Sequence, residues 1–167
     1  MPRRIRKVLI VIGIIFAVLF IMWQGAKMMA PGSYVYAENY QLAAPESRVI
    51  EAVKLFKKTH PEMAVPEAAN LASSEGRPDS SYWYFIYLYY PKENQIVLAW
   101  TGPTIDSLNT ELAFVSINEG LGLWNWKQIN KDFTGEDNKK LKAQFERRFV
   151  KELGIKYSDN GDSMSLW

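Results

Sequence analysis

The chain has 167 residues, of which 48% are hydrophobic and 14% aromatic, and it contains no cysteine. Disulfides, thiolate metal sites and a cysteine nucleophile are therefore excluded. The net charge of +2 is unevenly spread: five of the 20 basic residues precede residue 31, which leaves 15 basic against 18 acidic residues in 31–167. This larger part is slightly acidic, so the composition gives no support for nucleic-acid binding.

Residues 8–26 form an apolar stretch of nineteen residues without a charge. As a helix, this stretch would measure about 28 Å at roughly 1.5 Å per residue, close to the ~30 Å hydrocarbon core of a bilayer. We expect a single transmembrane span from Val8 to Ala26, with Trp23 at the membrane–water interface. Residues 1–30 are accordingly predicted to be a cytoplasmic N-terminus and a membrane anchor.

The charges that flank this span predict its orientation. Arg3, Arg4, Arg6 and Lys7 precede it, whereas only Lys27 follows closely. The side richer in Lys and Arg normally stays in the cytoplasm, so we expect a cytoplasmic N-terminus and an extracytoplasmic C-terminal domain, periplasmic or extracellular. A cleaved signal peptide is the alternative and also puts the domain outside the cytoplasm. Small residues are poorly placed for cleavage, which favours an uncleaved signal-anchor.

After the membrane, residues 31–44 are predicted to be a tether and residues 45–167 a single domain. Pro31 and Gly32 stop any helix that continues from the span. Aromatic residues alternate within 34–42, a pattern that fits a short strand or an extended segment lying on the domain.

Two segments of the domain, 45–59 and 134–153, have the apolar periodicity of amphipathic helices. The apolar stripes consist of Val49, Val53 and Phe56 in the first and of Leu141, Phe145, Phe149 and Leu153 in the second. Thr134 followed by Asp137 resembles a capping box at the start of the second helix. Gly154 is a suitable residue to end that helix.

Strand patterns lie between the two helices. Residues 82–90 include seven aromatics among nine residues and are apolar on both faces, which predicts a central strand covered on both sides. A short turn joins this segment to 95–101 in a hairpin. Segments 111–118 and 123–130 alternate in the same way, so the four strands are expected to form an antiparallel meander.

The predicted fold is therefore α+β. It has an N-terminal transmembrane helix followed by a single domain with an antiparallel sheet of about four strands and two flanking helices. In the tail, Asn160 and Gly161 form a strong hairpin signal between 155–157 and 164–167.

The number of aromatic side chains exceeds what a core of this size needs. The candidate interaction surface consists of Trp83, Tyr87, Tyr89, Trp124 and Trp126. Tyr and Trp are favoured at protein interfaces, and an aromatic sheet face can also stack on sugars. The alternative interpretation is structural: the helices cover one face of the sheet and the tether covers part of the other.

The common catalytic signatures are absent from the sequence. His60 is the only histidine and lies at the exit of the first predicted helix, where we expect a solvated or C-capping residue. Asp159 and Asp162 lack the ligand series of a calcium loop. We therefore predict no catalytic residue, cofactor, metal or small-molecule ligand.

These patterns favour a non-catalytic binding or accessory domain of the cell envelope, anchored by one span and acting through a protein partner. A membrane-tethered immunity protein that inhibits a toxin is a narrower alternative. An envelope enzyme and a sugar-binding domain are the others. A large exposed apolar patch would favour the first hypothesis, and a deep pocket with converging acids would favour the enzyme.

Overall fold

The computed structural model describes residues 13, 15–16, 34–79 and 81–159. The chain divides into two compact units, Met1–Val35 and Tyr36–Trp167. The predicted span over 8–26 lies outside the described residues, apart from three helical positions within it. Among the described residues, no helix combines the length and the apolar character that a bilayer crossing requires.

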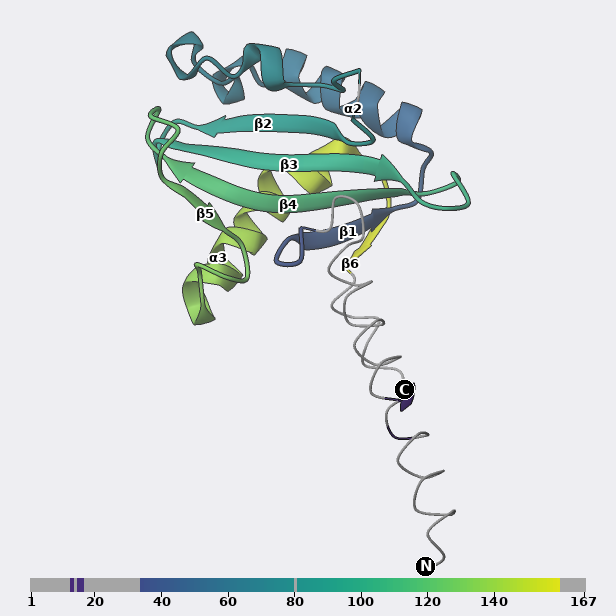
Figure 1. The fold of residues 1–167 in the computed structure, drawn as a ribbon. Helices are drawn as coiled ribbons and strands as arrows, with labels where there is room; N and C mark the ends of the chain where they lie inside the picture. Colours follow the sequence, from purple (N-terminus) through teal and green to yellow (C-terminus); the bar gives the residue numbers. More distant parts are fainter. Residues whose placement is uncertain (1–12, 14, 17–33, 80, 160–167) are drawn as a thin grey trace, which may run out of the picture. The chain divides into compact units, whose positions relative to one another are not determined.

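The second unit is an α+β domain built on one antiparallel sheet (Figure 1). The six strands are β1 (Glu38–Leu42), β2 (Tyr84–Tyr90), β3 (Gln95–Pro103), β4 (Thr110–Glu119), β5 (Trp126–Gln128) and β6 (Tyr157–Asp159). Their order is β2-β3-β4-β1-β6, and β5 also pairs with β4. The helices are α2 (Glu46–Thr59) and α3 (Gly135–Phe145), and α3 continues into η4 (Glu146–Val150) and η5 (Lys151–Leu153). The predicted α+β class and antiparallel sheet are confirmed.

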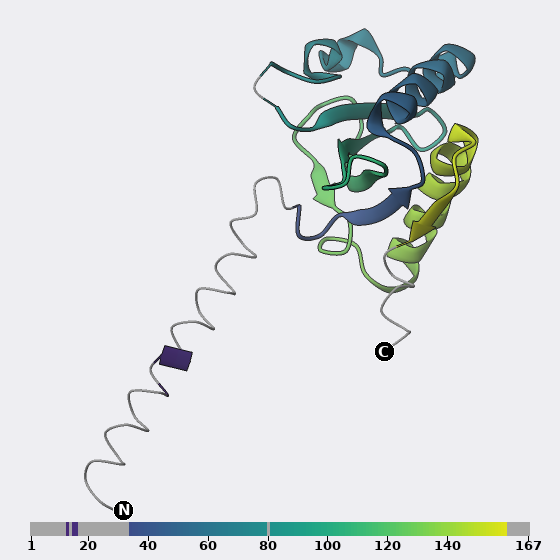
Figure 2. The ribbon, with the colours of Figure 1, turned by 90° about the vertical axis from the view of Figure 1, so that its right-hand side faces the viewer.

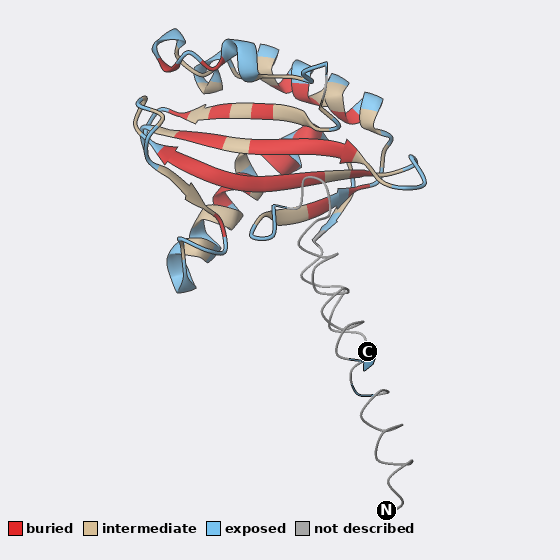
Figure 3. Ribbon diagram, viewed as in Figure 1, coloured by how far each residue is buried: buried red, intermediate tan, exposed pale blue. Residues whose placement is uncertain are grey.

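Both long helical segments pack on the same face of the sheet, here called the inner face (Figure 2). Val53 and Phe56 of α2 join Phe145 and Phe149 of the second helical run in one buried cluster. Strands β1 to β4 contribute their inward-facing residues to this cluster, and Figure 3 shows buried residues along the central strands. The expected apolar stripes therefore form the core.

The sheet has six strands rather than about four. One additional strand, β1, comes from the predicted tether 31–44 and pairs with β4 on one side and β6 on the other. Tyr40 and Leu42 of β1 are fully buried on the inner face, which explains why this short aromatic segment joins the sheet. The other strand, β6, comes from the tail and pairs with β1; Asn160 and Gly161 lie outside the described residues.

The expectation that 82–90 is a central strand is wrong, because β2 lies at an edge of the sheet. The segment is apolar on both faces because both faces are covered. The helices cover its inner side. Its outer side chains pack with Ala69 and Leu71, which lie in and beside the short helical turns η2 (Glu67–Ala69) and η3 (Ala72–Ser74). The edge itself is protected, since Gly76 exchanges two backbone hydrogen bonds with Phe85. Covering segments thus produce the pattern that normally marks a central strand.

Strand β5 is shorter than the predicted 123–130. The buried side chain of Asn118 explains the difference, because it holds the preceding connection as a turn. Its amide donates to the carbonyls of Gly120 and Gly122 at 2.8 and 3.0 Å, and its oxygen accepts from the backbone N–H of Asn125 at 3.0 Å. Residues before Trp126 therefore do not pair with β4.

The predicted helix 134–153 is helical from Gly135 to Leu153, but its pitch changes from α to π at Glu146 and to 3₁₀ at Lys151. Gly154 ends it at φ 65°, as expected for a C-terminal glycine. Thr134 occupies the N-cap position, yet its side chain makes no capping hydrogen bond, so the predicted capping box does not form.

We expect Phe145→Ala to lower the free energy of unfolding by about 3–5 kcal/mol, because it removes a fully buried ring that stacks on Phe114. The measurement is urea unfolding of the full chain in mild detergent, followed by circular dichroism. Leu55→Ala is the control: this side chain is 62% exposed on α2, and we expect a change within about 0.5 kcal/mol. A loss for Phe145→Ala as small as the control's would contradict the packing.

Candidate binding site

The face of the sheet opposite the helices, here called the outer face, contains most of the aromatic side chains named as an interaction surface. Two clusters form there. Ile96 packs with Tyr87, Tyr89 and Trp126. Trp100 packs with Trp83, Phe85 and Leu98 in the second cluster.

Four of the predicted interaction residues are half-buried on this face, namely Trp83, Tyr87, Tyr89 and Trp126. The rings of Tyr87 and Trp126 lie 6.4 Å apart. Trp124 differs, because it belongs to the connection between β4 and β5 and is 93% exposed. The structure thus brings four of the five residues to one face and separates the fifth from both clusters.

Trp83 lies across strand β3 at Gly102. A Cβ atom at Gly102 would stand 2.5 and 2.7 Å from two ring carbons of Trp83, so only glycine leaves room for the indole. The indole of Trp83 also packs on the indole of Trp100, with ring centroids 3.8 Å apart. The ring of Tyr82 meets it edge-on, with centroids 4.8 Å apart. The Tyr82 hydroxyl donates to the Pro103 carbonyl at 2.6 Å. These contacts fix Tyr82 and Trp83, here called the aromatic pair, at the end of β3.

The connection between β3 and β4, here called the 104–109 loop, is held by its own hydrogen bonds. The Asp106 carboxylate accepts from the Thr104 hydroxyl at 2.5 Å and from the Leu108 backbone N–H at 3.0 Å. These bonds favour the charged form and lower the pKa of Asp106. The loop leaves the side chain of Ile105 fully exposed and that of Leu108 71% exposed.

A groove of about 600 Å³ lies between this loop and the aromatic pair. We call it the Glu111 groove, and its lining residues are Tyr82, Trp83, Pro103, Thr104, Ile105, Asp106 and Glu111. Glu111 lies on β4, opposite Gly102 of β3 and Gln41 of β1. Its position on the outer face is therefore beside the Trp83 indole.

Glu111 is half-buried, and burial raises the pKa of its carboxyl group above the ordinary value. Within the described part of the chain, its carboxylate has no hydrogen bond and no ion pair. A partly desolvated carboxylate without a partner costs free energy in the folded domain. This cost makes Glu111 a residue of the outer face that calls for a functional explanation.

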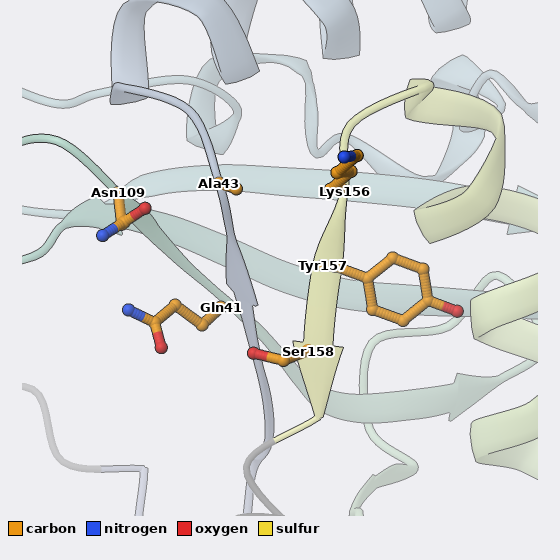
Figure 4. A pocket seen from close by; sticks show the side chains of 6 residues that line it. All are labelled: Gln41, Ala43, Asn109, Lys156, Tyr157 and Ser158. Carbon is orange, nitrogen blue, oxygen red and sulfur yellow. The ribbon is translucent and has the colours of Figure 1, made fainter.

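A second, smaller hollow of about 230 Å³ adjoins β1 and β6 (Figure 4). Figure 4 shows Gln41, Asn109 and Ser158 on one side of these strands, with Tyr157 pointing to the other. Gln41, which lines this hollow together with Lys156, is the cross-strand neighbour of Glu111, so the hollow lies beside the groove.

A third cavity, of about 400 Å³, lies between α2, the η2 and η3 turns and β2. Lys57 enters it and donates from Nζ to the Tyr87 carbonyl at 2.8 Å and to the Glu75 carboxylate. Burial lowers the pKa of the Lys57 ammonium to about 8, while the adjacent Glu75 carboxylate acts in the opposite direction. With both partners satisfied, this pair fastens residues 61–76 to the edge of the sheet.

His60 follows the last residue of α2 and donates its backbone N–H to the Phe56 carbonyl at 2.9 Å, as expected for a C-cap residue. Its ring packs on Phe56 at 4.5 Å, and Nδ1 lies 3.2 Å from a Glu62 oxygen. In the part of the chain that the structure describes, no group of three or more His, Asp or Glu side chains is placed to hold a metal ion.

Comparisons with protein-family models, with curated proteins and with solved structures find no match to this chain. The function must therefore be inferred from its own side chains. Ile105, Leu108 and Glu111 are not among the residues that the sequence predicted for an interaction surface. A signal for the first two was present, because two aliphatic residues interrupt an otherwise polar turn between predicted strands. No sequence pattern indicates Glu111, because its burial depends on the pairing of β4 with β3 and β1.

We expect Gly102→Ala to displace the Trp83 indole, because the added methyl group overlaps two of its ring carbons. The cost of such overpacking is about 1–3 kcal/mol of unfolding free energy. Two measurements check this: chemical denaturation, and the indole N–H signal of Trp83 in ¹⁵N-tryptophan-labelled protein, assigned with Trp83→Phe. The control is Gly122→Ala, whose added Cβ would meet Trp124 at an ordinary 3.5 Å. An unshifted Trp83 signal would contradict the close approach.

Proposed function

We propose that this chain is a single-span, membrane-anchored binding domain of a cell envelope that acts through a protein partner without catalysis. The uncharged stretch 8–26 supports the anchor, and the basic cluster before it supports a cytoplasmic N-terminus. The domain Tyr36–Trp167 is then presented on the extracytoplasmic side of the membrane.

The binding function is supported by an exposed apolar surface beside the Glu111 groove. We call it the exposed tip, and it consists of Tyr82, Ile105 and Leu108. Ile105 is fully exposed, Leu108 is 71% exposed and Tyr82 is 53% exposed. Single exposed apolar residues are common, but here three lie at one end of the sheet, on or beside a loop that is fixed by hydrogen bonds. A preorganised apolar and aromatic surface loses little conformational entropy when a partner binds.

Inhibition of an incoming toxin by a tethered immunity protein is a special form of this function, because it also requires one surface shaped for one partner. The enzyme alternative finds less support. The charged cavity beside α2 contains Lys57 and Glu75, which pair with each other, and Lys57 also binds the Tyr87 carbonyl. Groups engaged in this way fasten a loop rather than face a substrate.

The anchor and its orientation are tested by cysteine accessibility, for which this cysteine-free chain has no background. We expect a membrane-impermeant maleimide to label Leu55→Cys in intact cells or spheroplasts, and to label Pro2→Cys only after the membrane is opened. Intact mass should include residues 1–30. Labelling of Pro2→Cys in unopened cells, or protection of Leu55→Cys, would contradict the orientation, and loss of the first residues would identify a cleaved signal peptide.

The binding surface is tested by photo-crosslinking in native membranes. A benzoyl-phenylalanine at position 105 is expected to give one discrete adduct with another protein, because Ile105 lies at the centre of the exposed tip. The matched control carries the same group at position 55, which is also exposed but lies on α2. Equal adducts at both positions, or none at position 105, would count against this surface.

A further inference from the structure

The chemistry of the Glu111 groove indicates which kind of side chain it receives. Two carboxylates, those of Asp106 and Glu111, line the groove together with the rings of Tyr82 and Trp83. Among the described residues that line it, none is basic. The groove is therefore acidic and aromatic, with the apolar side chain of Ile105 at its rim.

The two carboxylates are not equivalent. Asp106 is engaged by the Thr104 hydroxyl and by a loop N–H, so its role in holding the 104–109 loop is fulfilled inside the domain. Glu111 has no such bond within the described residues, although it is half-buried. An external donor, and above all a cation, would offset the desolvation of Glu111.

The aromatic pair suits the same ligand. Cations are attracted to the faces of Trp and Tyr rings, and this attraction strengthens when water is excluded. Trp83 is held rigidly against Gly102 and Trp100, so its ring does not need to be ordered on binding. The volume of about 600 Å³ is sufficient for one long side chain together with part of the segment that bears it.

We propose that the Glu111 groove receives an arginine or lysine side chain of the partner protein, with an aliphatic neighbour of that residue packing on Ile105. The cation pairs with the Glu111 carboxylate and lies against the rings of Tyr82 and Trp83. This inference rests on the proposed function and specifies the partner's chemistry at the same surface.

Two other classes of occupant fit the observations less well. A neutral sugar stacks on aromatic rings, but it leaves the charge of Glu111 uncompensated and has no aliphatic group for Ile105. An anionic lipid surface would be repelled by Asp106 and Glu111. Charge complementarity therefore favours a basic protein segment.

The test uses the full chain in mild detergent as bait for a library of random linear peptides. We expect wild-type protein to select peptides with an Arg or Lys beside an aliphatic residue. Replacement of the selected Arg by citrulline, or of Lys by norleucine, is expected to weaken binding at least about tenfold, because the shape is kept and the charge is removed.

Glu111→Gln is the matched substitution in the domain, and we expect it to weaken binding of the same peptides by about the same factor. It removes an unpaired half-buried charge, so the fold should tolerate it, and circular dichroism checks this. The control is Glu119→Gln at the other end of β4, where the carboxylate is exposed and bonds Lys127 at 2.8 Å. Tyr82→Ala supplies a second variant, with an expected severalfold loss from the missing ring.

The outcomes separate the two proposals. Selected peptides without a basic residue, or equal binding by Glu111→Gln, would overturn the cation site while leaving a protein-binding surface in place. Failure to select any peptide, together with binding of wild-type protein to a glycan array, would overturn both the cation site and the protein-binding function at this surface.

Discussion

Phe145 stacks on Phe114 with ring centroids 4.4 Å apart and planes inclined by 13°, and this contact joins the C-terminal helical run to the middle of the sheet. Phe149 extends the same packing to Phe56 of α2 at 5.1 Å. Both helices are thereby committed to the inner face. The outer face is left to short turns and to its own aromatic side chains, so the two faces of the sheet differ because of this core.

Two side chains of the outer face and its 104–109 loop cost the fold free energy. Ile105 gains nothing from burial, and Glu111 is partly desolvated without a partner among the described residues. In contrast, the partly buried Lys57 and Glu75 pair has its hydrogen bonds satisfied inside the domain. The difference between satisfied and unsatisfied groups, rather than burial or charge alone, distinguishes a candidate site from a structural clamp.

Local pattern was sufficient to predict the helices and the hairpin of β2 and β3, because their periodicity depends only on residues close in sequence. Strand β2 was wrongly predicted to be central, because its outer side is covered by residues of and beside η2 and η3. The alternation of residues within 82–90 contains no information about this contact. Strand β5 was overextended because one buried side chain, Asn118, holds the preceding connection. For the same reason the predicted surface included Trp83 of the candidate site but not Glu111, which comes beside Trp83 only through the register of β3 and β4.

The position of β1 has a mechanical consequence. This strand follows directly from the N-terminal unit and is paired on both sides, with β4 and with β6. A pull on the preceding chain that is directed along β1 loads both of its neighbours. Such a pull shears the backbone hydrogen bonds of two ladders together instead of opening them one at a time. The chain thus enters this domain through a strand that is held on both sides.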